Sequence, residues 1–389
     1  MNGLGPLPFR VFANPRAGTP GTVVLTEAGF RRARADITGW PGYAPTPLRD
    51  LPWAERAAGV ATVRIKDEGG RFGLGSFKAL GGAWAVAQVL STELSRRGVA
   101  NAASSADLEA GRHGDATRAI TVTCATDGNH GRSVAWGAGR FGCKCVIFVH
   151  ATVSQARVDA IAEFGAEVRR VAGTYDDAVR AAALAATEHG WFVVSDTSWP
   201  GYTAVPVDVM QGYRLMADEA LDQWEGAPPT HAFVQGGVGG VAAAVSVHLR
   251  TRLAPAPALI VVEPDRAACL LASAEAGEPT AIPGDLDTLM AGLACGEPSL
   301  LAWRELERAA AAFMAVPDEA AVACLRLLAR HGIVIGESGV AGLAGLLLAA
   351  NDPVARELFG LTPASRVLLF GTEGATDPDL YARLLKEPK

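Results

Sequence analysis

The sequence lacks the features of several common protein classes. Its longest apolar run, Val340–Ala350, has 11 residues including two glycines, whereas a membrane-spanning helix needs roughly 20. Lysine and arginine total 35 against 41 acidic residues, and no run of five like charges gives the basic face of a nucleic-acid binder. Six cysteines in 389 residues are too few for a disulfide scaffold. We therefore expect neither a membrane nor a nucleic acid as partner.

Signals for export and for metal binding are also missing. The first ten residues, MNGLGPLPFR, have neither the charged start nor the apolar core of an export signal, so reduced thiols and a cytoplasmic location are expected. The seven histidines form no His-Glu-x-x-His motif and no cysteine pair has zinc-ligand spacing, so no metal site is expected. With 49% hydrophobic and 20% charged residues, the composition is that of a folded globular protein.

Short β-rich runs alternate with longer alanine-rich periodic runs, a pattern typical of parallel βαβ units. The expected strands are 120–125, 144–150, 167–171, 191–195, 231–235, 258–262 and 366–370. The expected helices are 130–141, 154–164, 175–189 and 241–253, with a buried, closely packed helix at 340–350. The first four strands should form one small parallel sheet and the last three should belong to a second sheet. Residues 91–118 are expected to be a surface helix and loop joining two domains.

Two glycine-rich turns could bind ligands. Gln235–Gly240 (QGGVGG) follows an expected strand and opens an expected helix, so its backbone N–H groups and the helix dipole can hold a phosphate. A tight turn with no ligand is the alternative. Thr126–Gly131 (TDGNHG) places Asp127, Asn129 and His130 in one turn at a helix start. A simple capped turn would also explain these residues.

Lys78 is a third candidate because of its position. It follows Ser76-Phe77 and begins the apolar run Ala79–Trp84. With Ser76 as the N-cap, Lys78 would lie at the positive end of a buried helix, where its pKa falls and its amine becomes nucleophilic. A lysine for an aldehyde, an amide for a ring oxygen and a glycine loop for a phosphate together suit pyridoxal 5'-phosphate.

These motifs resemble those of the tryptophan-synthase-β superfamily, the fold type II pyridoxal phosphate enzymes. The resemblance narrows to the diaminopropionate ammonia-lyase family over about residues 40–380. It is carried by six segments, which are Arg71–Gly82, Cys124–Arg132, Asp196–Tyr202, Met290–Pro298, Gly336–Gly339 and Thr372–Asp377. The chain departs from the family at Gly75-Ser76, where Asn-Ala is usual, and at Ala375, where Asp is usual. The resemblance implies two parallel-sheet α/β domains, 1–90 with 205–389 and 91–204, with the active site between them.

The resemblance also implies roles for individual residues. Lys78 would bind the cofactor covalently and then act as a base, and Asn129 would hydrogen-bond the ring oxygen. Thr372 would meet the pyridine nitrogen with a neutral hydroxyl, which favours elimination over transamination. The phosphate would be bound by backbone N–H groups of Gly236, Gly237, Val238, Gly239 and Gly240.

Two aspartates would then decide the substrate. Asp127 can act as a base on the face of the substrate opposite Lys78, so that both enantiomers of 2,3-diaminopropionate can lose their Cα proton. Asp196 can bind the substrate's β-ammonium group, although without the resemblance a strand-end cap is the favoured explanation. His130 is expected to be structural with some phosphate contact. Cys269 and Cys295 are expected either to lie close enough to pair or to be two reduced core thiols.

The resemblance implies a homodimeric carbon-nitrogen lyase of amino-acid catabolism, with a small amino acid as its substrate. It would convert 2,3-diaminopropionate to pyruvate and ammonia by α,β-elimination. Two alternatives are a lyase of the same fold that acts on serine, threonine or hydroxyaspartate, and a non-catalytic amino-acid-binding protein. The sequence leaves open the preferred enantiomer, the exact leaving group, any regulatory ligand and the pathway.

Overall fold

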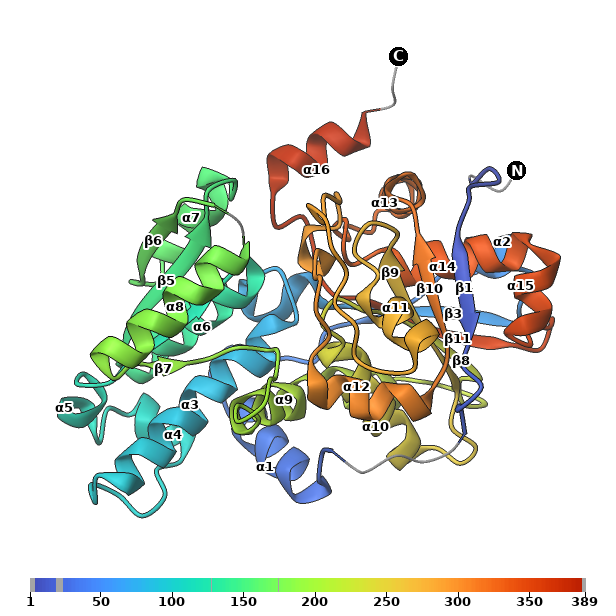
Figure 1. The fold of residues 1–389 in the computed structure, drawn as a ribbon. Coiled ribbons are helices and arrows are strands. Elements are labelled where there is room, and N and C mark those ends of the chain that lie inside the picture. Colours follow the sequence, from blue (N-terminus) through green and yellow to red (C-terminus); the bar gives the residue numbers. More distant parts are fainter. Residues whose placement is uncertain (1–3, 19–23, 127, 174, 387–389) are drawn as a thin grey trace. The chain divides into compact units, whose positions relative to one another are not determined.

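The computed structural model describes residues 4–18, 24–126, 128–173 and 175–386. The chain folds into two compact units (Figure 1). The first unit comprises Met1–Leu25, Pro45–Gly75 and Met216–Lys389, and the second comprises Thr26–Ala44 and Ser76–Leu215. No helix in the described part of the chain is both long and apolar enough to cross a membrane.

The first unit is built on a seven-stranded sheet. In spatial order its strands are β1 (Arg10–Ala13), β10 (Ala310–Val316), β9 (Ala258–Pro264), β8 (His231–Gln235), β11 (Arg366–Gly371), β3 (Thr62–Asp67) and β2 (Leu48–Asp50). The five inner strands are parallel. The short edge strands β1 and β2 run antiparallel to their neighbours, so the expected parallel sheet is in fact mixed at both edges.

Helices of the first unit bury the faces of this sheet. They are α2 (Pro52–Ala58), α10 (Gly240–Arg252), α11 (Cys269–Ala276), α12 (Leu300–Ala309), α13 (Asp318–Arg330), α14 (Ala341–Asn351), α15 (Pro353–Leu358) and α16 (Pro378–Leu385), with 3-10 turns at Glu68–Gly73 and Ala291–Leu293. The buried helix expected at 340–350 is α14, and it packs closely on the sheet because it lacks side chains at two contacts. A Cβ at Gly342 would lie 2.6 Å from the carbonyl oxygen of Phe233, and one at Gly345 2.8 Å from Val262.

The second unit contains the small parallel sheet expected from the sequence. Its strand order is β6 (Glu167–Val171), β5 (Lys144–His150), β4 (Thr121–Ala125) and β7 (Phe192–Val193). Its helices are α1 (Glu27–Thr38), α3 (Lys78–Arg96), α4 (Ser105–Glu109), α5 (Gly114–Thr117), α6 (Asn129–Phe141), α7 (Gln155–Ala162) and α8 (Tyr175–His189). One further helix, α9 (Ala204–Asp222), continues from the second unit into the first at Leu215–Met216.

The structure divides the chain differently from the expected boundaries of 1–90 with 205–389 and 91–204. A boundary at residue 90 would cut α3, which is one continuous helix belonging entirely to the second unit. Residues 91–118 are therefore not an interdomain linker, since they contain the end of α3 together with α4 and α5 of the same unit. Alanine and glycine let α3 pack against α6: a Cβ at Gly137 would lie 2.7 Å from the Cα of Ala83.

Candidate functional site

The glycine loop of the first unit lies where two neighbouring strands end. Gly236–Gly240 follows β8, and Thr372 follows β11. These strands are parallel neighbours, so their carboxyl ends meet at one edge of the sheet. Gln235 joins them further, since its Nε2 donates to the carbonyl of Phe370 at 2.5 Å and to that of Gly339 at 2.7 Å. The loop and the buried Thr372 are thus held at the edge where α/β proteins bind ligands.

The loop has the conformation of an anion cradle. Gly237 and Gly239 have φ values of 57° and 96°, a region that side-chain-bearing residues rarely adopt. A Cβ at Gly236 would lie 2.5 Å from the Cγ of Glu263. In the described chain the amides of Gly237, Val238 and Gly240 donate to no acceptor, and α10 begins without a side-chain cap. Unpaired amides at the start of a 13-residue helix can bind a phosphate.

The Glu263 side chain packs against Gly236 of this loop. It is fully buried, and its two carboxylate oxygens accept the N–H groups of Leu270 at 2.9 Å and Leu271 at 2.8 Å. Burial raises the pKa of Glu263 to about 8, although those two hydrogen bonds oppose the rise. The side chain therefore ties the start of α11 to the strand that borders the loop.

Lys78 is the first residue of α3, as expected, but Ser76 is not its N-cap. Phe77 occupies the cap position and makes no side-chain capping bond, while Ser76 is buried one residue earlier. The Nζ atom of Lys78 donates to Oδ2 of Asp196 at 2.5 Å. The same atom lies 5.3 Å from the ring centroid of Phe77 and 5.7 Å from that of Tyr213. The ammonium group is therefore held by one carboxylate and flanked by two aromatic rings.

Asp196 joins Lys78 to His130. Its burial would raise its pKa, but Lys78 and then His130 outweigh this and hold the pKa below its usual value, so the carboxylate stays ionised. His130 Nε2 lies 2.8 Å from the carbonyl oxygen of Val194, and because a carbonyl only accepts, we assign the hydrogen to Nε2. The other ring nitrogen, Nδ1, lies 3.8 Å from Oδ2 of Asp196. His130 is thus anchored to the strand-end backbone, which agrees with a structural role.

Asn129 is the first residue of α6, at the carboxyl end of β4. The turn before it is shaped by Thr126, whose Oγ1 accepts the N–H groups of Gly128 at 3.0 Å and Gly131 at 3.1 Å. Asp127, the expected second base, lies outside the described residues. Thr126 therefore caps this turn, in agreement with a simple capped turn as the alternative to a ligand site. The turn also places the amide side chain of Asn129 at a helix start.

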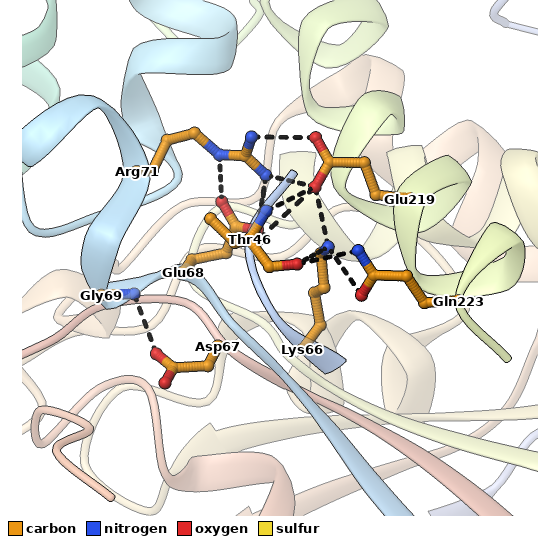
Figure 2. A network of polar contacts seen from close by, with 8 residues as sticks. All are labelled: Thr46, Lys66, Asp67, Glu68, Gly69, Arg71, Glu219 and Gln223. Atoms are coloured by element: carbon orange, nitrogen blue, oxygen red, sulfur yellow. Dashed lines mark hydrogen bonds and ion pairs between the residues drawn. The ribbon is translucent and has the colours of Figure 1, made fainter. Parts of the chain in front are cut away.

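A second charged cluster lies in the first unit (Figure 2). We call it the buried charge network, and its members are Thr46, Lys66, Glu68, Arg71, Glu219 and Gln223. The Arg71 guanidinium binds Glu68 through two bonds of 2.8 Å and Glu219 through two more of 2.8 Å. Lys66 pairs with Glu219 at 2.7 Å. The two cations and two anions balance, and Figure 2 shows the guanidinium enclosed by the two carboxylates.

Sequence reasoning missed this network and also missed Tyr213. Arg71 and its partner Glu219 are separated by 148 residues in the sequence, so no local motif contains both. One signal was present, since Lys66 lies within a run of β-forming residues and a strand buries such a charge only when it is paired. Tyr213 gave no signal of its own, because an aromatic residue in an apolar helix reads as core.

The remaining expectations concern cysteines and metals. Cys269 and Cys295 both border Gly237: the Cys269 thiol lies 3.6 Å from its carbonyl oxygen, and a Cβ there would lie 3.8 Å from the Cys295 sulfur. Neither forms a disulfide. Across the described ranges, no cluster of three His, Cys, Asp or Glu side chains is arranged to hold a metal.

The residues present fit pyridoxal phosphate. The glycine loop offers amides that have no acceptor in the described chain and that suit its phosphate. Lys78 offers a primary amine, and Asn129 offers an amide at a helix start. Thr372 offers a neutral hydroxyl at the same sheet edge as the loop. Lys78, Asn129, His130 and Asp196 come from the second unit, and the loop and Thr372 from the first.

Comparison with known proteins agrees with this chemistry. Residues 40–357 match the family described as pyridoxal-phosphate dependent enzyme. The chain is 40% identical to diaminopropionate ammonia-lyase of Escherichia coli strain K12, covering 90% of this chain and 89% of that one. It is 38% identical to the Salmonella typhimurium diaminopropionate ammonia-lyase, covering 88% of each.

Solved structures extend the likeness to the fold. The holo crystal structure of the Escherichia coli diaminopropionate ammonia-lyase matches with a TM-score of 0.89 and 36% identity over 97% of both chains. The structure of that enzyme with an aminoacrylate-PLP azomethine reaction intermediate matches with a TM-score of 0.86 over the same share. The chain therefore belongs to the fold type II pyridoxal-phosphate dependent enzymes and, within them, to the diaminopropionate ammonia-lyase family.

Proposed function

We propose that this chain is a carbon-nitrogen lyase that converts 2,3-diaminopropionate to pyruvate and ammonia. The ion pair between Lys78 and Asp196 carries the proposal, since it shows a buried, ionised carboxylate binding an ammonium group at 2.5 Å. 2,3-Diaminopropionate differs from serine in having an amine in place of the β-hydroxyl. A carboxylate that binds a cation therefore favours the diamine.

The pair also explains how the carboxylate becomes available to substrate. Were Lys78 to bind the cofactor, its nitrogen would no longer be the free ammonium that pairs with Asp196. Asp196, whose side chain is only 15% exposed, is then left with His130 as the neighbour whose charge acts on it. A buried carboxylate without a counter-charge is costly, so a substrate that brings its own β-ammonium restores the lost pair.

The other residues take the roles implied by their chemistry. Bound pyridoxal phosphate supplies an electron sink for the bond that breaks at Cα. The Lys78 amine removes the Cα proton from one face, and Asp127 removes it from the other, which would let both enantiomers react. Asn129 binds the ring oxygen and Thr372 meets the pyridine nitrogen. The backbone amides of Gly237, Val238 and Gly240 bind the phosphate, whereas those of Gly236 and Gly239, which were also expected to do so, already donate to the carbonyls of Val262 and Gly236.

Two conservative variants test these assignments on D- and L-diaminopropionate and L-serine. Asp196→Asn keeps the shape but removes the charge, so pyruvate formation from both diaminopropionates should fall by roughly 10–150-fold, because a hydrogen bond to a charged group contributes about 1.5–3 kcal/mol. Serine turnover should change less. Asp127→Asn should lose one enantiomer, which we expect to be the D form, and retain part of the other. Cofactor absorbance checks that both variants still load.

Each contrary result points to a different error. Equal loss of both enantiomers in Asp127→Asn would reject two bases on two faces. A wild-type preference for serine over both diaminopropionates would favour the dehydratase alternative and direct attention to Gly75, Ser76 and Ala375. Failure to release pyruvate from any β-substituted amino acid would favour a non-catalytic binding protein.

We further propose that the enzyme is a cytoplasmic homodimer. The homodimer rests on the family resemblance alone. The location rests on the unpaired cysteines, since cytosolic proteins keep their thiols reduced. Light scattering measures the first: a mass near twice 40.3 kDa is expected, and a monomer mass would reject it. Fractionation of the source cells measures the second.

A further inference from the structure

Tyr213 is seated against Lys78 by the packing of α9 on α3. Its side chain is 1% exposed, and its ring lies 4.6 Å from that of Phe77, centroid to centroid. On the α3 side the ring occupies the place that a side chain at Gly81 would fill, because a Cβ there would collide with its Cε1 atom. Gly81 lies one helical turn after Lys78, so the tyrosine ring and the lysine amine share one face of α3.

The hydroxyl of Tyr213 is buried without a hydrogen-bond partner of standard geometry in the described chain. Such a group is costly and calls for an explanation. Burial raises its pKa above the usual value, while the nearby Lys78 charge opposes the rise and Asp196 adds to it. The hydroxyl therefore keeps its proton at neutral pH and remains a hydrogen-bond donor.

Another tyrosine of the same unit shows what a structural hydroxyl looks like. The Tyr202 Oη accepts the N–H of Ser195 at 3.0 Å and donates to the carbonyl of Val193 at 2.9 Å. Both hydrogen-bonding capacities of Tyr202 are used by backbone, and the bonds fix the loop that carries Asp196. The Tyr213 hydroxyl makes no such backbone hydrogen bond. Packing accounts for the position of its ring, but the role of the hydroxyl must be inferred from the groups near it.

The amine of Lys78 needs two different partners during its work. As an ammonium it donates to Asp196, and a carboxylate that only accepts favours this charged form. As an uncharged amine, which is the form that can attack an aldehyde or take a proton, it has a lone pair that can accept a hydrogen bond. Asp196 cannot donate one when ionised, whereas a protonated phenol can.

We propose that Tyr213 is a positioning residue whose hydroxyl donates a hydrogen bond to the uncharged amine of Lys78 and so favours its reactive form. The inference rests on the proposed function only in that Lys78 is the point of cofactor attachment. No bond is made or broken by Tyr213 itself. Its contribution is to hold the amine and stabilise it when Asp196 alone would keep it charged.

Tyr213→Phe is the primary test, because it keeps the ring that Gly81 and Phe77 enclose. The cofactor-free enzyme is mixed with pyridoxal phosphate, and the rate of attachment is followed by absorbance. Competitive labelling across pH then gives the apparent pKa of Lys78. Loss of a donor to the neutral amine should raise this pKa by roughly 0.5–1 unit and slow attachment about three- to tenfold at pH 7. In the loaded enzyme kcat should fall while KM changes little.

Tyr381→Phe is the matched control, since it also removes a buried hydroxyl that lacks a partner in the described chain, but in the other unit. It should change neither the pKa of Lys78 nor the attachment rate. Thermal unfolding of both variants reports any loss of folding. Incorporation of 3-fluorotyrosine at position 213 is an independent test. Its more acidic hydroxyl is a stronger hydrogen-bond donor, so the pKa of Lys78 should fall.

The pH data must be interpreted with the neighbouring titratable groups in view. They are Asp196, His130 on α6 and Cys124 on β4, whose pKa is raised by burial and by the Asp196 charge, and all are unchanged in these variants. An unchanged Lys78 pKa in both the phenylalanine and the fluorotyrosine proteins would overturn the inference. Borohydride reduction and peptide mapping separate this from failure of the proposed function: cofactor attached to a lysine other than Lys78 in the wild type would reject the functional assignment itself.

Discussion

The buried charge network and the cluster around Lys78 contain the same kinds of side chain but differ in how completely they are paired. In the network, Arg71 makes five bonds to Glu68, Glu219 and Thr46, and the charges cancel. In the Lys78 cluster one carboxylate faces both the Lys78 ammonium and the His130 imidazole, and the Tyr213 hydroxyl beside them has no hydrogen bond of standard geometry in the described chain. The first arrangement is complete without any ligand, and the second is not.

This difference separates groups that hold the fold from groups that do chemistry. A fully paired buried network resists change, because removing any member exposes its partners to an uncompensated environment. A cluster with spare hydrogen-bonding capacity can exchange one partner for another, which catalysis requires. The glycine loop belongs to the second kind, since its amides at Gly237, Val238 and Gly240 also lack acceptors among the described residues. Each of the following experiments tests whether one residue stabilises the fold or acts in binding and catalysis.

Lys78→Ala should have the largest effect, and mainly on activity. Removing the amine takes away both the attachment point and a base, so activity should fall by more than about 10⁴-fold, the upper range for a general base. The free energy of unfolding should also fall, because Asp196 loses its ammonium partner, but most of the protein should stay folded. Pyruvate assay and urea unfolding measure the two quantities. Major unfolding of this variant would show that Lys78 is needed mainly to stabilise the fold.

Arg71→Met should show the reverse pattern. It leaves Glu68 and Glu219 buried with only Lys66 between them, and breaking such a pair costs about 3–5 kcal/mol of unfolding free energy. Arg96→Met is the control, since Arg96 pairs with Glu93 but is 72% exposed, and exposed pairs contribute little to stability. Equal stability of the two variants in urea would show that the network is not structural.

Glu263→Gln should reveal a pH-dependent contribution to stability. Because the pKa of Glu263 is raised to about 8 in the folded chain from roughly 4.3 when unfolded, the folded state binds the proton more tightly. Its contribution is complete below about pH 4.3 and declines toward pH 8. Between pH 6 and 7.5, wild type should lose about 2 kcal/mol relative to the variant. Identical pH profiles would show that Glu263 is ionised in the folded protein.

Gly237→Val should have the smallest of these effects, and mainly on cofactor affinity. A φ of 57° costs a side-chain-bearing residue roughly 1–2 kcal/mol, so relaxation would turn the loop amides away from the phosphate and weaken cofactor binding about tenfold. Gly226→Val has the same backbone problem, with φ of 85°, on an exposed turn with open space around it. Cofactor titration should distinguish them. Similar affinities in both variants would remove Gly237 from the phosphate site.

Strands with consistent β-branched patterning could be predicted closely from the sequence. The boundaries of β5, β6 and β8 agree with expectation residue for residue. The reason for β5 and β8 is that buried parallel strands read as continuous apolar runs. The strands β3 and β10 were not predicted. The first carries Lys66 and Asp67, which only distant partners make tolerable in a strand. The second begins with three alanines, a composition that favours helix until the sheet overrides it.

Motifs located Lys78, Asn129 and the glycine loop because each stands at the start of a helix with a recognisable local pattern. The same reasoning failed for the N-cap. Ser76 was expected to cap α3, but the helix begins later and leaves Ser76 buried in the preceding bend. Tyr213 and the network could not be found in this way, since their meaning depends on contacts between segments more than 100 residues apart.

The pair formed by Arg71 and Glu219 also has a topological meaning. It closes a loop of 148 residues, because the chain leaves the first unit after Gly75 and returns to it at Met216. The entropy of closing a flexible loop grows only as the logarithm of its length, and each doubling costs about 0.6 kcal/mol. The stability of the Arg71–Glu219 pair should therefore depend little on the length of the chain segment between these two residues. Insertions or deletions in the surface turns of the enclosed segment should accumulate in evolution without loosening it.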